Sequence, residues 1–487
     1  MMTANNKNHL IFAISLLYFL IMVLLFWDYS MDDAFITFRY AENFASGHGF
    51  VFNPGESPVE AYSNFLWLLI LAGFYKLGLP IVLLAKMLGP LFFVLTGFIW
   101  YRFAFKNVDG FSYLIAPSFL FSAYVAFWAV SGLELGLYAC LLSLFVLAVH
   151  YRRWYSWLLV PVVTLSRPEG FAISVFIIVL HILLNRRSNE FRWKLPLINM
   201  GVLVVTIIAL TLFRLQTFGY PLPNTVYAKS VIAPDGLFQL LKGLLYLLPL
   251  TLLFLYGLWR AFRTSPKPAL IIIFSGVFLL QSLINCLADA VMNFHFRYMV
   301  VFLPFFLATA YYGFSKLNIV RYQSIILPIL IISLLAPGWA IYKSVQTERK
   351  IIAAQDGIIH FINELPGSPR ISLTDIGRIP YYTRAKYNDL WGLASINIVR
   401  DSLFGSREIK RFPDYFILVG YKPENKTILR FGHENMIKTH SFFDKIYQLQ
   451  AVGLPVGADI SVPGYYYLAY LKNEKALDSL INIYPIK

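Results

Sequence analysis

The sequence predicts a polytopic α-helical membrane protein with a soluble α/β domain at its C-terminal end. Of its 487 residues, 58% are hydrophobic and only 14% are charged. Apolar runs of about 20 residues, the length that a helix needs to cross a bilayer, recur from Leu10 to Ile341. Beyond that point charges become frequent, and short β-rich runs (371–373, 415–421 and 465–471) alternate with Pro, Gly and Asn turns. We therefore predict a membrane domain over residues 1–342 and an α/β domain over residues 343–487.

The apolar runs predict about eleven spans. The first run is followed by Trp27 and Asp28 rather than by the small residues of a signal-peptide cleavage site, so we expect it to be retained as a span. Residues 63–79 are apolar enough to cross the membrane, but we predict that they form a helix lying in the membrane interface. The predicted spans are residues 9–27, 81–101, 113–130, 135–150, 155–166, 171–184, 196–214, 237–259, 269–288, 298–314 and 323–342.

The distribution of Lys and Arg predicts the orientation of these spans. Cytoplasmic loops of membrane proteins are rich in both residues, and with residues 63–79 in the interface the basic clusters, such as that in 186–194, lie inside. The basic residues of these cytoplasmic loops thus account for the net charge of +15, and we expect no nucleic-acid partner. We predict a multi-pass protein of the cytoplasmic (inner) membrane, with a cytoplasmic N-terminus and an external, periplasmic C-terminal domain.

Two adjacent carboxylates, Asp32 and Asp33, follow the first span and begin a polar, aromatic stretch of the first external loop, residues 28–80. At a membrane surface, one carboxylate can act as a general base on a lipid-borne substrate, and two can hold a divalent cation such as Mg²⁺ or Mn²⁺. We favour Asp33 as the base, with Asp32 orienting it or sharing an ion. The alternative is structural, because Asp is also a favoured N-cap, and the spacing of Phe35 and Phe38 predicts a helix here that ends at Gly47.

Outside the predicted interfacial helix, which contains Lys76, the external loops that precede the C-terminal domain contain four basic residues. These run against the orientation bias and need a local reason. Each lies in a short motif-like stretch, and together with the carboxylates they make the external face the candidate active face. The four residues are Arg39, Arg167, Lys229 and Arg297.

Several of these stretches also have a structural interpretation. Arg167 and Pro168 could join two helices, with Glu169 as the ion-pair partner. Glu134 could be a first-turn acid stabilised by a helix dipole. His295 and Arg297 could anchor a helix end at lipid headgroups, although His, Arg and Tyr side chains in residues 295–298 also suit an anion.

Taken together, these stretches resemble the GT-C glycosyltransferases related to the mycobacterial terminal arabinofuranosyltransferase. The first loop carries the longest resemblance, over residues 32–40, 47–56 and 60–67. Shorter motifs follow in the same order over residues 132–134, 166–170, 223–229, 297–298 and 387–393. One departure is mild: the group commonly reads Val-Glu-Gly-Tyr-Thr where this chain has Val-Glu-Ala-Tyr-Ser over residues 59–63. The resemblance implies an enzyme that moves a sugar from a polyprenyl-phosphate donor to a cell-envelope glycan or glycolipid acceptor on the outer face of the membrane.

That activity gives each candidate residue a role. A sugar that leaves a polyprenyl phosphate releases a phosphate anion, which external cations can stabilise. We assign donor-phosphate binding to Arg297 and Lys229 first, and then to Arg167 and His295. Asp33 and Asp32 are the candidate catalytic residues. Substrate-binding roles go to a set of polar residues in the remaining motifs: Arg39, Glu134, Glu169, Tyr298 and Asp389.

Two other classes of protein fit the composition. A transporter or flippase of lipid-linked sugars would place ionisable residues in mid-span and often shows repeated halves, whereas these spans are nearly free of charge and no repeat is visible. A protein that senses envelope glycans through its outer domain would leave Asp32 and Asp33 dispensable. The first loop favours the glycosyltransferase over both.

Overall fold

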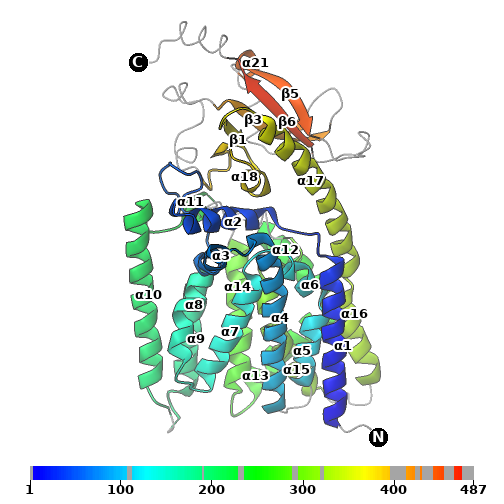
Figure 1. The fold of residues 1–487 in the computed structure, drawn as a ribbon. Helices are drawn as coiled ribbons and strands as arrows, with labels where there is room; N and C mark the ends of the chain where they lie inside the picture. The colour runs from blue at the N-terminus through cyan, green and yellow to red at the C-terminus, as the bar shows by residue number, and fades with distance from the viewer. Residues whose placement is uncertain are drawn as a thin grey trace.

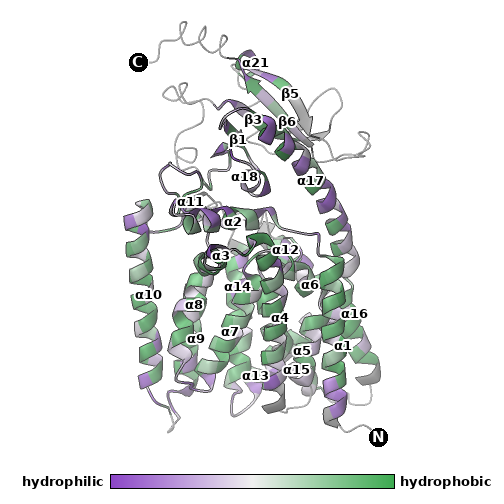
Figure 2. Cartoon of the chain, in the orientation of Figure 1, coloured by the Kyte–Doolittle hydropathy of each residue, from purple (hydrophilic) through white to green (hydrophobic). Residues whose placement is uncertain are grey.

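The computed structural model is a bundle of helices with a small mixed β-sheet at one end (Figure 1). It describes residues 4–106, 112–188, 191–228, 235–287, 294–317, 323–394, 413–422, 428–429, 443–453 and 466–473. Hydrophobic residues predominate along the bundle helices, and hydrophilic residues gather in the part of the long helix that leads to the sheet (Figure 2). The mostly helical, apolar fold with a small C-terminal sheet, expected from the composition, is confirmed in this coarse form.

The bundle helices follow the predicted spans closely. Their bounds are α1 (Ala4–Leu25), α4 (Ile81–Lys106), α5 (Ile115–Phe121), α6 (Ala123–Ala129), α7 (Leu135–His150), α8 (Ser156–Ser166), α9 (Glu169–Asn185), α10 (Lys194–Phe218), α12 (Asp235–Tyr246), α13 (Leu248–Arg263), α14 (Ala269–Leu287), α15 (Leu303–Ser315) and α16 (Gln323–Leu335). A turn of 3-10 helix precedes α5 (Ser112–Leu114) and another precedes α15 (Val300–Phe302).

Helix length decides which of these elements can cross a bilayer alone. Among the described residues, five helical segments are long and apolar enough to do so, or up to seven if each of two bent pairs is one span. The bent pairs are α5 with α6, at 56°, and α12 with α13, at 99°. Helices α7, α8, α9 and α15 are apolar but shorter. The protein is therefore membrane-embedded, while the number of eleven spans stays a prediction.

A layer of short helices covers the end of the bundle beneath the sheet (Figure 1). It contains α2 (Asp32–Ala45), α3 (Phe65–Lys76) and α11 (Asn224–Ala228). Helix α2 forms where the spacing of Phe35 and Phe38 predicts it and stops before Gly47, which has a left-handed φ of 86°. Its N-cap is Met31 and no side chain caps it, so the N-cap interpretation of the two aspartates is wrong. Helix α3 has only 12 residues, too few to cross a bilayer.

The C-terminal domain, called the outer domain after its predicted side of the membrane, contains a six-stranded mixed sheet with the order β2-β1-β3-β6-β5, in which β4 pairs with β3. Strand β1 is parallel to β2 and β3, whereas β6 is antiparallel to β3 and β5. The three predicted β-runs lie in β1, β3 and β6, and the other strands were not predicted. The outer elements are β1 (Arg370–Leu373), α18 (Arg378–Tyr381), β2 (Lys386–Asp389), β3 (Tyr415–Lys422), β4 (Ile428–Leu429), α21 (Phe443–Ile446), β5 (Tyr447–Gly453) and β6 (Tyr466–Lys472).

One long helix joins the two parts. Helix α17 (Gly338–Glu364) begins in the bundle and continues to the sheet (Figure 1). The predicted domain boundary between residues 342 and 343 therefore falls inside a continuous helix rather than in a linker. Because α17 is continuous, we expect little freedom of the sheet relative to the bundle.

Candidate active site

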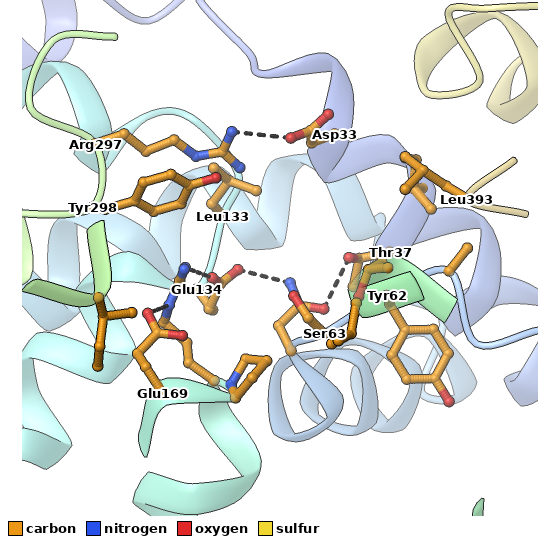
Figure 3. Close-up of a pocket in the computed structure, with 18 of the residues that line it drawn as sticks. Asp33, Thr37, Tyr62, Ser63, Leu133, Glu134, Glu169, Arg297, Tyr298 and Leu393 are labelled. Atoms are coloured by element: carbon orange, nitrogen blue, oxygen red, sulfur yellow. Dashed lines mark hydrogen bonds and ion pairs between the residues drawn. The ribbon is translucent and has the colours of Figure 1, made fainter. Parts of the chain in front are cut away.

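Asp33 and Arg297 form an ion pair at the wall of a cavity of about 370 Å³ (Figure 3). Nη1 of Arg297 lies 3.0 Å from Oδ2 of Asp33, and their side chains are 7% and 21% exposed. The cavity is lined by residues of α2, α11 and α14, by the residues before α3 and α7, by the junction of α8 and α9, by Arg297 and Tyr298, and by Leu393 of the outer domain. The structure thus brings the favoured catalytic carboxylate and the favoured phosphate-binding cation together at one site.

Contacts with the loop before α7 hold Asp33 at the cavity. The backbone N–H of Met31 donates to the carbonyl of Ser131 at 3.0 Å, which joins the start of α2 to that loop. The next residue, Gly132, has a φ of 83°, and a Cβ there would lie 2.9 Å from the Phe38 ring. A side chain would therefore separate the loop from α2, which explains the glycine in this motif.

A strained turn positions Arg297. His295 and Phe296 both have positive φ angles, 46° and 62°, a conformation that costs a bulky residue such as Phe on the order of 1–3 kcal/mol. The indole N–H of Trp128 donates to the carbonyl of His295 at 2.8 Å and holds the turn. The Arg297 guanidinium then lies 5.7 Å from the Trp128 ring centre, where a cation–π contact orients it. Such strain commonly occurs at ligand-binding sites.

A second charged group lies across the same cavity. Arg167 pairs with Glu134 and, at 2.5 Å, with Oε1 of Glu169, and all three side chains are nearly buried. Its guanidinium is therefore engaged by two carboxylates, so it is less suited to bind a phosphate than Arg297. Arg167 follows the end of α8 and Glu169 begins α9, as the structural interpretation of this motif expected.

Tyr298 lies between the two guanidinium groups. Its ring centre is 5.5 Å from the guanidinium carbon of Arg297 and 5.6 Å from that of Arg167. Because both cations are attracted to the faces of the ring, Tyr298 keeps them apart and in fixed positions. It lines the cavity, and its substrate-binding role stays a prediction.

Asp32 does not share the surroundings of Asp33. Its Oδ2 accepts the backbone N–H of Gly377 at 3.0 Å, and its Oδ1 accepts that of Arg378 at 2.9 Å and the Gln355 side-chain amide at 3.2 Å. Burial, and secondly repulsion from Asp375, raise the pKa of Asp32 to about 7. Asp32 therefore caps α18 of the outer domain and joins that domain to α2.

The separate partners of Asp32 and Asp33 bear on the metal hypothesis. One carboxylate is engaged by backbone N–H groups of the outer domain and the other by a guanidinium group. Within the described part of the chain, no group of three or more His, Cys, Asp or Glu side chains could hold a metal ion. The pair does not fit a Mg²⁺ or Mn²⁺ site, and we derive no step through a metal.

Arg39 and Asp389 lie outside the cavity and organise the outer domain around it. Arg39 donates to the backbone carbonyls of Phe52, at 2.8 Å, and of Pro380. Asp389 is fully buried, and burial raises its pKa to about 6. Its oxygens accept the backbone N–H groups of Trp391 and Ala394, both at 2.8 Å, and so shape the turn that carries Leu393 to the cavity.

His295 and Lys229 do not add to the described site. Burial, and secondly the charge of Lys242, lower the pKa of His295 to about 4, so its ring is neutral near pH 7. Its Nε2 lies 2.7 Å from Oγ of Ser344, and the residue does not line the cavity. Its position suits it to form the turn before Arg297 rather than to bind an anion. Lys229 lies outside the described residues.

Four neutral polar residues of the cavity were not predicted. The Asn64 amide donates to Oε2 of Glu134 at 2.7 Å, and its oxygen accepts the Thr37 hydroxyl at 3.0 Å, as Figure 3 shows. Gln281 and Asn285 reach the cavity from α14. The sequence contains a signal for Gln281 and Asn285, because amide side chains within an apolar helix are energetically costly and often functional.

The comparisons with known structures concern the fold. ArnT from Cupriavidus metallidurans, solved with bound undecaprenyl phosphate, aligns with a TM-score of 0.58 and 14% identity over 96% of this chain and 98% of ArnT. Its apo structure gives a TM-score of 0.56, with the same identity and coverage. The mycobacterial arabinofuranosyltransferase AftD aligns at a TM-score of 0.50 and 13% identity over 97% of this chain but only 40% of AftD. The chain has a GT-C fold.

Sequence comparisons add less. A family model described as "Domain of unknown function (DUF8728)" matches residues 341–469, which cover most of α17 and the outer domain. No curated protein matches the chain. The GT-C resemblance seen in the first loop is thus confirmed at the level of the fold, which aligns along almost the entire chain.

Proposed function

We propose that this protein is a membrane glycosyltransferase that takes a sugar from a polyprenyl-phosphate donor. The observation that carries the proposal is the Asp33–Arg297 ion pair on the wall of a cavity at the end of a bundle with a GT-C fold. A general base and a cation for a leaving phosphate are the two groups that this transfer needs. Undecaprenyl phosphate bound to ArnT, a protein of the same fold, supports a lipid phosphate of this class as the leaving group.

The transfer assigns a step to each member of the pair. The bond between the anomeric carbon and the phosphate oxygen breaks, and its electron pair stays on the phosphate, whose charge Arg297 stabilises. The acceptor hydroxyl oxygen forms the new bond to the anomeric carbon and gives its proton to the Asp33 carboxylate. Arg297 binds Asp33 through Nη1, so the two functional groups are already adjacent before substrate enters.

The surroundings of the cavity support an acceptor that arrives from the outer side of the membrane. Leu393 of the outer domain lines the cavity, and the side-chain amide of Asn224, the first residue of α11, donates to the backbone carbonyls of Gly392 and Leu393 at 2.6 and 2.7 Å. The outer domain therefore borders the place where the acceptor would enter. We propose a cell-envelope glycan or glycolipid as the acceptor, at the outer face of the inner membrane.

The proposal is tested with cells that lack the protein and are complemented by variants. Asp33→Asn should behave as the deletion does: the polyprenyl-phosphate sugar accumulates, and one sugar is missing from an envelope glycan. Asp28→Asn is the matched control, since Asp28 lies in the same loop, 61% exposed, in a surface pair with Arg349. Mass spectrometry of lipid and glycan fractions measures both pools. Restoration of both by Asp33→Asn would reject the proposal.

A further inference from the structure

Helix α14 brings two neutral amides to the cavity. Gln281 and Asn285 are four residues apart, so they lie on the same face of the helix, and both line the cavity. Each is only 2% exposed, within a helix otherwise apolar enough to cross the membrane. With a rise of 1.5 Å per residue, Gln281 lies about 9 Å inside the end of α14 at Leu287.

Gln281 has hydrogen-bonding capacity that the described protein does not use. Its Oε1 is buried, and no described residue lies within hydrogen-bond distance of it. An amide that is buried without a partner in a spanning helix is destabilising, and in most proteins it is paired or replaced. A hydrogen-bonding group supplied by a ligand in the cavity would explain why the buried Gln281 amide is kept there.

The charges of the cavity define what that partner is. Every charged side chain that lines it takes part in an ion pair: Asp33 with Arg297, and Glu134 and Glu169 with Arg167. The amides of α14 are thus left to recognise neutral groups, and an amide both donates to and accepts from a hydroxyl. The volume of about 370 Å³ is at the lower end of small-ligand sites, which suits a monosaccharide.

We propose that Gln281 and Asn285 bind hydroxyl groups of the donor sugar, and that this sugar is an uncharged pentose or hexose. The inference rests on the proposed function and names the substrate class of the same site. The position of Gln281 and Asn285 inside the end of α14 favours the donor sugar over the acceptor, because a sugar attached directly to a lipid phosphate is held at the membrane boundary. A glycan acceptor approaches from the side of the outer domain.

The test compares Gln281→Met and Asn285→Leu, which keep side-chain size and remove the amide, with the wild type in lipid nanodiscs. The probes are synthetic short-chain prenyl-phosphate pentoses and hexoses, their monodeoxy analogues, and the corresponding uronic acids. Ser282→Ala is the matched control on α14, because among the described residues the Ser282 hydroxyl bonds only the helix carbonyl of Phe278, and Ser282 does not line the cavity. Thermal unfolding of each variant confirms that equal amounts of folded protein are compared.

We expect the wild type to use one neutral sugar and to reject one of its monodeoxy analogues by about tenfold or more in kcat/KM. Gln281→Met or Asn285→Leu should lower kcat/KM for the complete sugar by a similar factor and accept the deoxy analogue almost equally. Unchanged discrimination in both variants, an effect on the acceptor KM alone, or preference for a uronic acid would overturn the inference while leaving the proposed function intact. No transfer by the wild type to any acceptor would reject both.

Discussion

Replacing Arg297 tests whether its charge and its shape act on the departing phosphate. The guanidinium is 7% exposed, lies 3.0 Å from Asp33 and is oriented by Trp128 and Tyr298, so it is held in place before the donor binds. Losing a charge-assisted bond that forms chiefly in the transition state costs roughly 2–4 kcal/mol, or about 30- to 1,000-fold in rate. We expect that loss for Arg297→Ala. Lysine keeps the charge but loses the planar fork, so Arg297→Lys should recover activity only in part.

The assay is turnover per folded enzyme, with the lipid-linked sugar that accumulates in cells lacking the protein. Arg349→Ala is the control, since that arginine is 43% exposed in a surface pair. A separate measurement of polyprenyl phosphate binding shows whether Arg297 acts on the phosphate or only holds Asp33. We expect weaker binding by Arg297→Ala but not by Asp33→Asn. Near-normal turnover of both Arg297 variants would refute the assignment.

Three further predictions concern the residues around the pair. Since the pKa of Asp32 is raised to about 7 in the folded protein, its contribution to stability is present below about pH 4 and is lost as the pH rises to 7. Thermal unfolding of Asp32→Asn should lack that decrease, and an equal pH slope in both proteins would contradict it. Gly377→Ala places a Cβ 2.1 Å from the Asp32 backbone oxygen and should lower turnover, whereas Gly73→Ala, with open space around it, should not. Asn64→Leu removes the hydrogen bond to Glu134 and should cost about 1–3 kcal/mol of unfolding free energy, measured by denaturation; no loss would mean that the bond is not formed.

Local patterns in the sequence predict much of the fold. The period of the apolar residues in α2 locates that helix, and the apolar runs locate the bundle helices to within a few residues. The end of the bundle is harder to predict, because α17 continues past the last long apolar run of the sequence into the outer domain. Helix formation there depends on tertiary packing rather than on a change in composition.

The site depends on contacts between distant parts of the chain, which a single sequence does not reveal. Asp33 and Arg297 are 264 residues apart. The adjacent carboxylates of the first loop pointed to Asp33 and the charge bias of the external loops to Arg297, but neither signal predicted that the two side chains meet. The division of roles between Asp32 and Asp33 could not be predicted, since the residue that holds Asp32 is 345 positions away at Gly377. Arg39 and His295 lie in motifs like that of Arg297. Arg39 is nevertheless engaged by backbone carbonyls, and His295 belongs to a turn outside the cavity.

The most direct test of the account follows the lipid-linked sugar itself. Purified wild-type protein and Asp33→Asn are placed in sealed vesicles that contain a labelled polyprenyl-phosphate sugar and the acceptor glycan fraction. A glycosyltransferase should release polyprenyl phosphate and form one labelled glycan product, while Asp33→Asn should bind the donor and form none. If the wild type instead moves the intact labelled lipid to the other leaflet without cleaving it, the protein is a flippase, and the proposed sugar transfer is contradicted.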